Sequence, residues 1–190
     1  CEMQQKIVFI GGPSTGKTAV LNELMKRNYF CMPEISREIT FKAKEQGIDQ
    51  LFLKKPLLFS KMLLEAREQQ FLDAEKTTHN IVFFDRGIPE VYAYMNYLKT
   101  TYPPIFIEKS KAYRYDKVYL FSPWKEIYTS DNERYETFKE SVLINQFLIK
   151  AYKELGYAIL EVPFGAVKDR TNFIINSLVC EIPRHIKKPT

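Results

Sequence analysis

Residues 7–18, IVFIGGPSTGKT, are the most informative stretch of this chain. Four apolar residues precede a glycine pair, and apolar residues at helical spacing follow Thr18, so a strand, a tight turn and a helix are predicted here. Residues 11–18 match the pattern GxxxxGK followed by Ser or Thr, in the setting that this pattern requires. Glycines let backbone N–H groups turn inward around a phosphate, and the start of a helix adds a partial positive charge. The stretch therefore predicts a phosphate-binding loop.

The side chains of this loop have distinct expected roles. Lys17 can reach the β- and γ-phosphates of a nucleotide, and the Thr18 hydroxyl can bind Mg²⁺. ATP is favoured over GTP because the sequence holds no NKxD guanine-reading motif. We therefore expect ATP and Mg²⁺ as cofactors. The expected nucleotide-binding residues of the loop are Gly11, Gly12, Pro13, Ser14, Thr15, Gly16, Lys17, Thr18 and Ala19.

Composition limits the broad class of the protein. The chain has 190 residues, enough for one domain with a substantial core. No apolar run approaches the roughly 18 residues of a membrane-spanning helix. Cys1, Cys31 and Cys180 are far apart and form no CxxC pair, as expected for reduced thiols in a cytoplasmic protein. The net charge of +5 is mild and no nucleic-acid-binding motif accompanies it, so we expect no nucleic-acid partner.

Short β-rich runs alternate with amphipathic segments, which is typical of an α/β fold with a parallel sheet. We predict a three-layer α/β/α sandwich with its ligand site at the carboxyl ends of the strands. Residues 1–181 are expected to form one domain, followed by a basic tail at 182–190. The expected strands are 6–10, 29–34, 80–85, 116–121 and 157–163, and the expected helices are 17–27, 36–47, 55–78, 89–100, 136–156 and 167–179.

Charged residues follow two of the expected strands. Asp85 ends an apolar strand, where its carboxylate could hold Mg²⁺ through water or orient a nucleophile. Arg86 could bind a substrate phosphate or a nucleoside hydroxyl, or form a structural salt bridge. Glu34 could accept the proton of an acceptor hydroxyl or hydrogen-bond a sugar, and it could instead cap the next helix. Arg37, one helical turn on, would line the same acceptor side of the crevice.

Residues 122–137 form a long polar segment after the fourth strand, where small-molecule kinases place a mobile lid. Arg134 and Lys125 are the candidates for contact with the transferring phosphoryl group, and an ordinary solvated helix start is the alternative. Trp124 is the only tryptophan. We expect its ring to pack against other side chains, and stacking on a base is the alternative.

Two further residues have both a binding and a structural interpretation. The loop after Pro163 could hold the adenine, with Arg170 stacked on it, although Arg170 could also be an ordinary helix-face residue. The helix beginning at Pro89 carries tyrosines at near-helical spacing. They are expected to pack in the core, but Tyr94 or Tyr97 could contact an acceptor.

These segments together resemble a known family. The chain is similar to the P-loop ATPase and kinase-like family, catalogued among AAA-type domains, that includes the ribosylnicotinamide kinase domain of a bacterial NAD-biosynthesis regulator. The resemblance implies the strand order 2-3-1-4-5, binding of ATP and Mg²⁺, and a cytoplasmic protein. The motifs that carry it are GGPSTGKT, MPEISRE, FFDRGIPEVYAYM, LFSPWKEIYTSDNERYETF and VPFGAVKDR.

Three functional classes are compatible with these residues. The favoured one is a small-molecule kinase that transfers the γ-phosphate of Mg-ATP to a nucleoside or riboside-like acceptor, because phosphoryl transfer depends on positioning and electrostatics. Lys17, Asp85, Glu34 and Arg134 would be its catalytic residues, and Glu34, Arg37, Arg86 and Tyr94 would bind the acceptor. The second is a regulatory ATPase or GTPase switch with a protein partner. This alternative stays open because the predicted lid contains few arginines. A nucleic-acid-binding module is the third and weakest.

Overall fold

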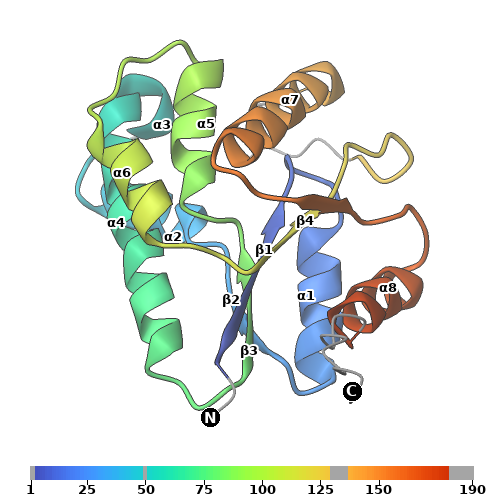
Figure 1. Ribbon diagram of the computed structural model, residues 1–190. Coiled ribbons are helices and arrows are strands. Elements are labelled where there is room, and N and C mark those ends of the chain that lie inside the picture. The colour runs from blue at the N-terminus through green and yellow to red at the C-terminus, as the bar shows by residue number, and fades with distance from the viewer. Residues whose placement is uncertain (1–2, 49–50, 129–136, 180–190) are drawn as a thin grey trace, which may run out of the picture.

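A parallel five-stranded sheet forms the centre of the molecule (Figure 1). The computed structural model describes residues 3–48, 51–128 and 137–179. The strand order is β2-β3-β1-β4-β5, which confirms the order implied by the family resemblance. The strands are β1 Gln5–Ile10, β2 Phe30–Met32, β3 Ile81–Asp85, β4 Lys117–Leu120 and β5 Ile159–Glu161.

Helices cover both faces of the sheet and complete the predicted three layers (Figure 1). One face packs against α1 and α8, and the other against α4 and α7, with α5 beside α7. Within the described ranges no helix is both long and apolar enough to cross a bilayer. The helices are α1 Lys17–Lys26, α2 Ser36–Glu45, α3 Leu51–Lys54, α4 Pro56–Glu75, α5 Pro89–Tyr97, α6 Ile105–Ala112, α7 Phe138–Glu154 and α8 Val167–Val179.

The alternating side chains of β1 build the two cores. Val8 and Ile10 cluster with side chains of α4 and α7, whereas Ile7 and Phe9 cluster with those of α1 and α8. All four are fully buried, as expected for a central strand of a parallel sheet. Because β1 pairs in parallel with both β3 and β4, the ends of these strands meet at one edge of the sheet. That edge receives the phosphate loop and the residues after β3.

Two helices were not predicted from the sequence. The short α3 precedes α4, and α6 follows Pro103 and Pro104, with Pro104 at its N-cap position. Both are brief, so hydrophobic periodicity gives little signal for them. The predicted basic tail at 182–190 and half of the predicted lid, residues 129–136, lie outside the described residues.

Candidate functional site

Lys17, the first residue of α1, turns back over the loop between β1 and α1. Its Nζ donates hydrogen bonds to the backbone oxygens of Gly11 (2.8 Å) and Gly12 (2.7 Å) and to Thr15 Oγ1 (3.2 Å). Burial, together with the positive charge of Arg86, lowers the pKa of Lys17 to about 8. The amine is therefore held inside the loop, where the oxygens of a bound phosphate would meet it.

Two glycines give this loop its shape. Gly11 has a φ of 143°, and a Cβ built there would lie 2.3 Å from the backbone oxygen of Phe121. Gly16 has a φ of 88°, and its Cβ would lie 2.4 Å from Nη1 of Arg170. The Phe121 backbone oxygen excludes a side chain at Gly11, and a side chain at Gly16 would strain the left-handed backbone and displace the Arg170 guanidinium. The next residue but one, Thr18, is exposed, so its hydroxyl is accessible to a metal ion bound with the nucleotide.

Arg170 of α8 supports the loop from the side. Its residue surface is only 2% exposed. Its Nη1 donates to the backbone oxygen of Thr15 (2.9 Å), and its Nε donates to that of Pro163 (3.1 Å). The guanidinium also lies over the ring of Phe121, 4.6 Å from its centroid. Adenine contact by Arg170 stays a prediction, and these bonds assign it the separate role of joining the phosphate loop to the loop after β5.

Glu34, just after β2, lies at the centre of an ion-pair cluster. Its Oε1 lies 3.5 Å from Nη2 of Arg67 on α4 and accepts a hydrogen bond from the amide of Ser36 (2.9 Å). Its Oε2 forms an ion pair with Nε of Arg86. Burial would raise the pKa of Glu34, but Arg86, Arg67 and the Ser36 amide together lower it to about 2. Glu34 therefore satisfies an amide at the start of α2 and also anchors two arginines.

Arg86, directly after β3, is held in an unusual backbone conformation. Its φ is 73°, and its amide donates to the backbone oxygen of Phe9 (3.0 Å), which continues the pairing of β1 and β3 by one residue. Its Nη1 lies 3.3 Å from Glu90 Oε2 and 3.3 Å from the hydroxyl oxygen of Tyr94. A residue other than glycine is strained in this left-handed backbone conformation, and such strain persists only where surrounding contacts hold the residue in place. The contacts around this guanidinium supply that constraint.

Asp85 is the least satisfied acid of the site. The residue is buried, and its Oδ1 has no hydrogen-bond partner among the described residues. Burial raises the pKa of Asp85, although nearby Lys17 and Arg86 oppose that change. Burial likewise raises the pKa of Glu90, which is fully enclosed. A buried carboxylate oxygen without a partner, next to the phosphate loop, fits a group that binds Mg²⁺ or its water.

Any Mg²⁺ here would depend on the nucleotide for most of its ligands. In the parts of the chain that the structure describes, no group of three or more His, Cys, Asp or Glu side chains could hold a metal ion. Mg²⁺ bound to nucleotides commonly uses one or two protein ligands, with phosphate oxygens and waters as the others. Thr18 and Asp85 fit that smaller requirement.

The remaining predicted site residues lie at different places in the fold, and one of them lies outside the described residues. Arg37 is exposed on the first turn of α2, and Lys125 is exposed after β4. Arg134 lies outside the described residues. Tyr94 is half-buried and joins the cluster through Arg86, while its neighbour Tyr92 is buried in the core, as expected.

Arg67 and Glu90 belong to the site but were not predicted from the sequence. Arg67 Nη1 donates to the backbone oxygen of Gly87 (2.7 Å), which fixes the turn after Arg86. A sequence signal for Arg67 exists, because it lies on the buried stripe of α4 between Leu64 and Phe71. A charge on an apolar stripe needs a buried partner. Glu90 gives no comparable signal, since a carboxylate in the first turn of a helix is ordinary.

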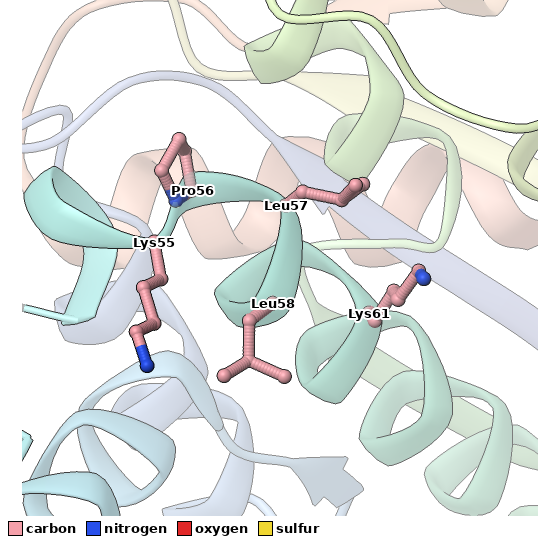
Figure 2. A pocket seen from close by; sticks show the side chains of 5 residues that line it. All are labelled: Lys55, Pro56, Leu57, Leu58 and Lys61. Atoms are coloured by element: carbon pink, nitrogen blue, oxygen red, sulfur yellow. The ribbon is translucent and has the colours of Figure 1, made fainter.

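Two hollows on the surface are separate from these residues. One, of about 350 Å³, lies at the start of α4 and is lined by Lys55, Pro56, Leu57, Leu58 and Lys61 (Figure 2). The other, of about 530 Å³, lies along α7 from Thr137 to Gln146. Neither includes a residue of the phosphate loop or of the Glu34 cluster.

Several solved structures, kinases among them, share this fold. Deoxyadenosine kinase from M. mycoides matches with a TM-score of 0.69 and 18% identity over 93% of this chain and 100% of that one. The NadR protein, solved in complex with NR, matches with a TM-score of 0.75 and 18% identity over 99% of this chain. This chain covers 54% of NadR, about half its length. Thymidylate kinase from Candida albicans matches with a TM-score of 0.62 and 17% identity over 94% of this chain and 92% of that one.

The sequence itself matches at the level of a family. Among curated proteins, none matches this chain. A family model described as an AAA domain matches residues 6–170, a span that includes the phosphate loop, Glu34, the Asp85–Arg86 pair and Arg170. The chain therefore belongs to this AAA-domain family.

Proposed function

We propose that this protein is an ATP-dependent kinase of a small molecule with a free hydroxyl, nucleoside-like or riboside-like. One observation carries the proposal. The phosphate loop and a buried cluster of acids and arginines meet at the same edge of the sheet, close enough for Arg86 and Asp85 to act on the pKa of Lys17. A donor site and an acceptor site side by side are what direct phosphoryl transfer requires.

On the donor side, the loop would hold the phosphates of ATP. Lys17 would exchange its bonds to the loop carbonyls for bonds to the β- and γ-phosphates. Thr18 and Asp85 would hold Mg²⁺, which neutralises charge on the phosphates when bound. Arg134 would add a positive charge at the transferring group.

On the acceptor side, the state of the arginines supports a hydroxyl acceptor. Arg67 and Arg86 are each engaged by Glu34, and Arg86 also by Glu90. Guanidinium groups that are already paired with carboxylates offer little net attraction to a second anion, whereas carboxylates accept hydrogen bonds from sugar hydroxyls. Glu34 and Arg86 would orient the acceptor hydroxyl, with Tyr94 and the exposed Arg37 nearby.

The likeness to solved kinases is consistent with this assignment. The deoxyadenosine kinase was solved with dCMP and the NadR protein with NR. Both the nucleoside-type acceptor and the cytoplasmic location are part of the proposal for this chain. A partner-dependent switch ATPase is the competing function.

A screen for acceptor-dependent ADP release tests the proposal. Purified protein with Mg-ATP is offered a panel of nucleosides and vitamin-like ribosides. Turnover that appears only with particular acceptors supports the kinase. Slow hydrolysis that ignores every acceptor but rises with a protein partner would favour the switch. Lys17→Ala serves as the loop control, and unchanged ATP affinity in this variant would refute the phosphate-binding assignment.

A further inference from the structure

An aromatic stack lies beside the phosphate loop. The rings of Trp124, after β4, and Phe164, after β5, are 4.9 Å apart between centroids and nearly parallel, at 17°. The guanidinium of Arg170 lies 5.7 Å from the centroid of the Trp124 ring. Aromatic pairs in this arrangement attract each other beyond the effect of the area that they bury, so the two rings hold each other in place.

This stack is joined to the phosphate loop by one side chain. Arg170 donates both to the backbone oxygen of Thr15 in the loop and to that of Pro163, the residue before Phe164. The two backbone oxygens are therefore separated by no more than the span of a guanidinium and its hydrogen bonds. The Oγ of Ser122 also donates to a carboxylate oxygen of Glu161, which ties the segment after β4 to the end of β5.

Phe164 leaves much of its ring uncovered. The residue is 52% exposed, although its ring is stacked on Trp124. Base–aromatic stacking stabilises binding, and every base offers a flat face for it. Phe164 supplies a partly exposed ring, and the neighbouring Pro163 is tied through Arg170 to the phosphate loop.

We propose that Phe164, supported by Trp124, is the stacking platform for the base of the nucleotide whose phosphates bind residues 11–18. This inference rests on the proposed nucleotide-binding function and specifies how that site recognises the donor. The base is held by its face, and Arg170 keeps the platform in register with the phosphate loop. Replacing the ring therefore weakens binding of a ligand with a base and spares a ligand that consists of phosphates only.

Calorimetry with ADP and with inorganic pyrophosphate tests the platform. Phe164→Leu keeps an apolar side chain but removes the ring, and Phe164→Tyr keeps the ring. We expect Phe164→Leu to bind ADP about tenfold more weakly than the wild type, with pyrophosphate affinity unchanged and Phe164→Tyr close to the wild type. Equal loss of both ligands, or unchanged ADP affinity in Phe164→Leu, would overturn the inference. Pyrophosphate binding also reports that each variant is folded around the loop.

The fluorescence of Trp124, the single tryptophan, provides a second test. In the wild type, ADP should change the emission of Trp124 more than pyrophosphate does, because only ADP places a base against the stack. Equal changes with both ligands contradict the platform. If the wild type binds neither ADP nor pyrophosphate, the proposed nucleotide-binding function itself fails, and that result is distinct from a failure of the platform alone.

Discussion

Replacing Glu34 by Gln should destabilise the protein in a strongly pH-dependent way. The pKa of Glu34 is about 2 in the folded protein, because Arg86, Arg67 and the Ser36 amide outweigh the effect of burial, and its ordinary value is 4.5. Each pKa unit corresponds to about 1.4 kcal/mol, so the ionised carboxylate contributes up to about 3 kcal/mol to the free energy of unfolding at neutral pH.

The sign follows from proton binding. Between pH 2 and 4.5 the unfolded chain binds more protons at this group than the folded protein does, so stability rises with pH through that range. The contribution is complete above about pH 5, and about 2 kcal/mol of it is lost by pH 3. Glu34→Gln should therefore lose up to about 3 kcal/mol at pH 7 and clearly less at pH 3.

Urea unfolding at pH 7, 5 and 3 measures this difference. Glu38→Gln is the matched control, because Glu38 lies nearby on the first turn of α2 and pairs with Lys42 in an exposed ion pair. Exposed pairs contribute about 0–1 kcal/mol, so the control should change little at any pH. The reasoning is refuted if Glu34→Gln and Glu38→Gln cost the same at pH 7, or if the cost of Glu34→Gln does not depend on pH.

Three other substitutions have predicted outcomes. Gly16→Ala should lower stability by about 1–2 kcal/mol and weaken ADP binding, because φ is 88° and a Cβ would displace Arg170; thermal unfolding and calorimetry measure both. Gly87→Ala should cost about 1–3 kcal/mol in urea unfolding, since its Cβ would lie 2.4 Å from the Tyr152 hydroxyl. Asp85→Asn should retain ADP binding without Mg²⁺ but lose the gain that Mg²⁺ gives, as calorimetry with and without the ion would reveal.

The strands and their ends could be predicted because their signals are local. Four apolar residues before Gly11, and four before Asp85, mark buried parallel strands that end in a turn. The parallel arrangement then brings the ends of neighbouring strands together, and the structure places Arg86 and Glu34 in contact accordingly. The pattern of residues thus predicted which groups meet.

The partners of these groups could not be predicted, because they depend on how helices pack. Arg67 reaches Glu34 and Gly87 only because α4 lies against the ends of β2 and β3, and no local pattern specifies that contact. The direction of the pKa changes depends on the same packing. Glu34 forms direct ion pairs with Arg67 and Arg86 and accepts the Ser36 amide, whereas Asp85 Oδ1 has no hydrogen-bond partner among the described residues.

That difference separates two roles within one cluster. Ion pairs lower the pKa of Glu34, whose ionised form stabilises the fold, whereas burial raises the pKa of Asp85 and disfavours its charged form. Asp85→Asn should therefore be as stable as the wild type at pH 7, or more stable, while Glu34→Gln is less stable. Both variants should lose turnover with an acceptor. Active sites commonly retain groups that function requires although these groups lower the stability of the fold. Opposite effects of the two substitutions on stability, together with loss of turnover in both, would therefore indicate a catalytic site. A structural ion-pair network would not give that combination.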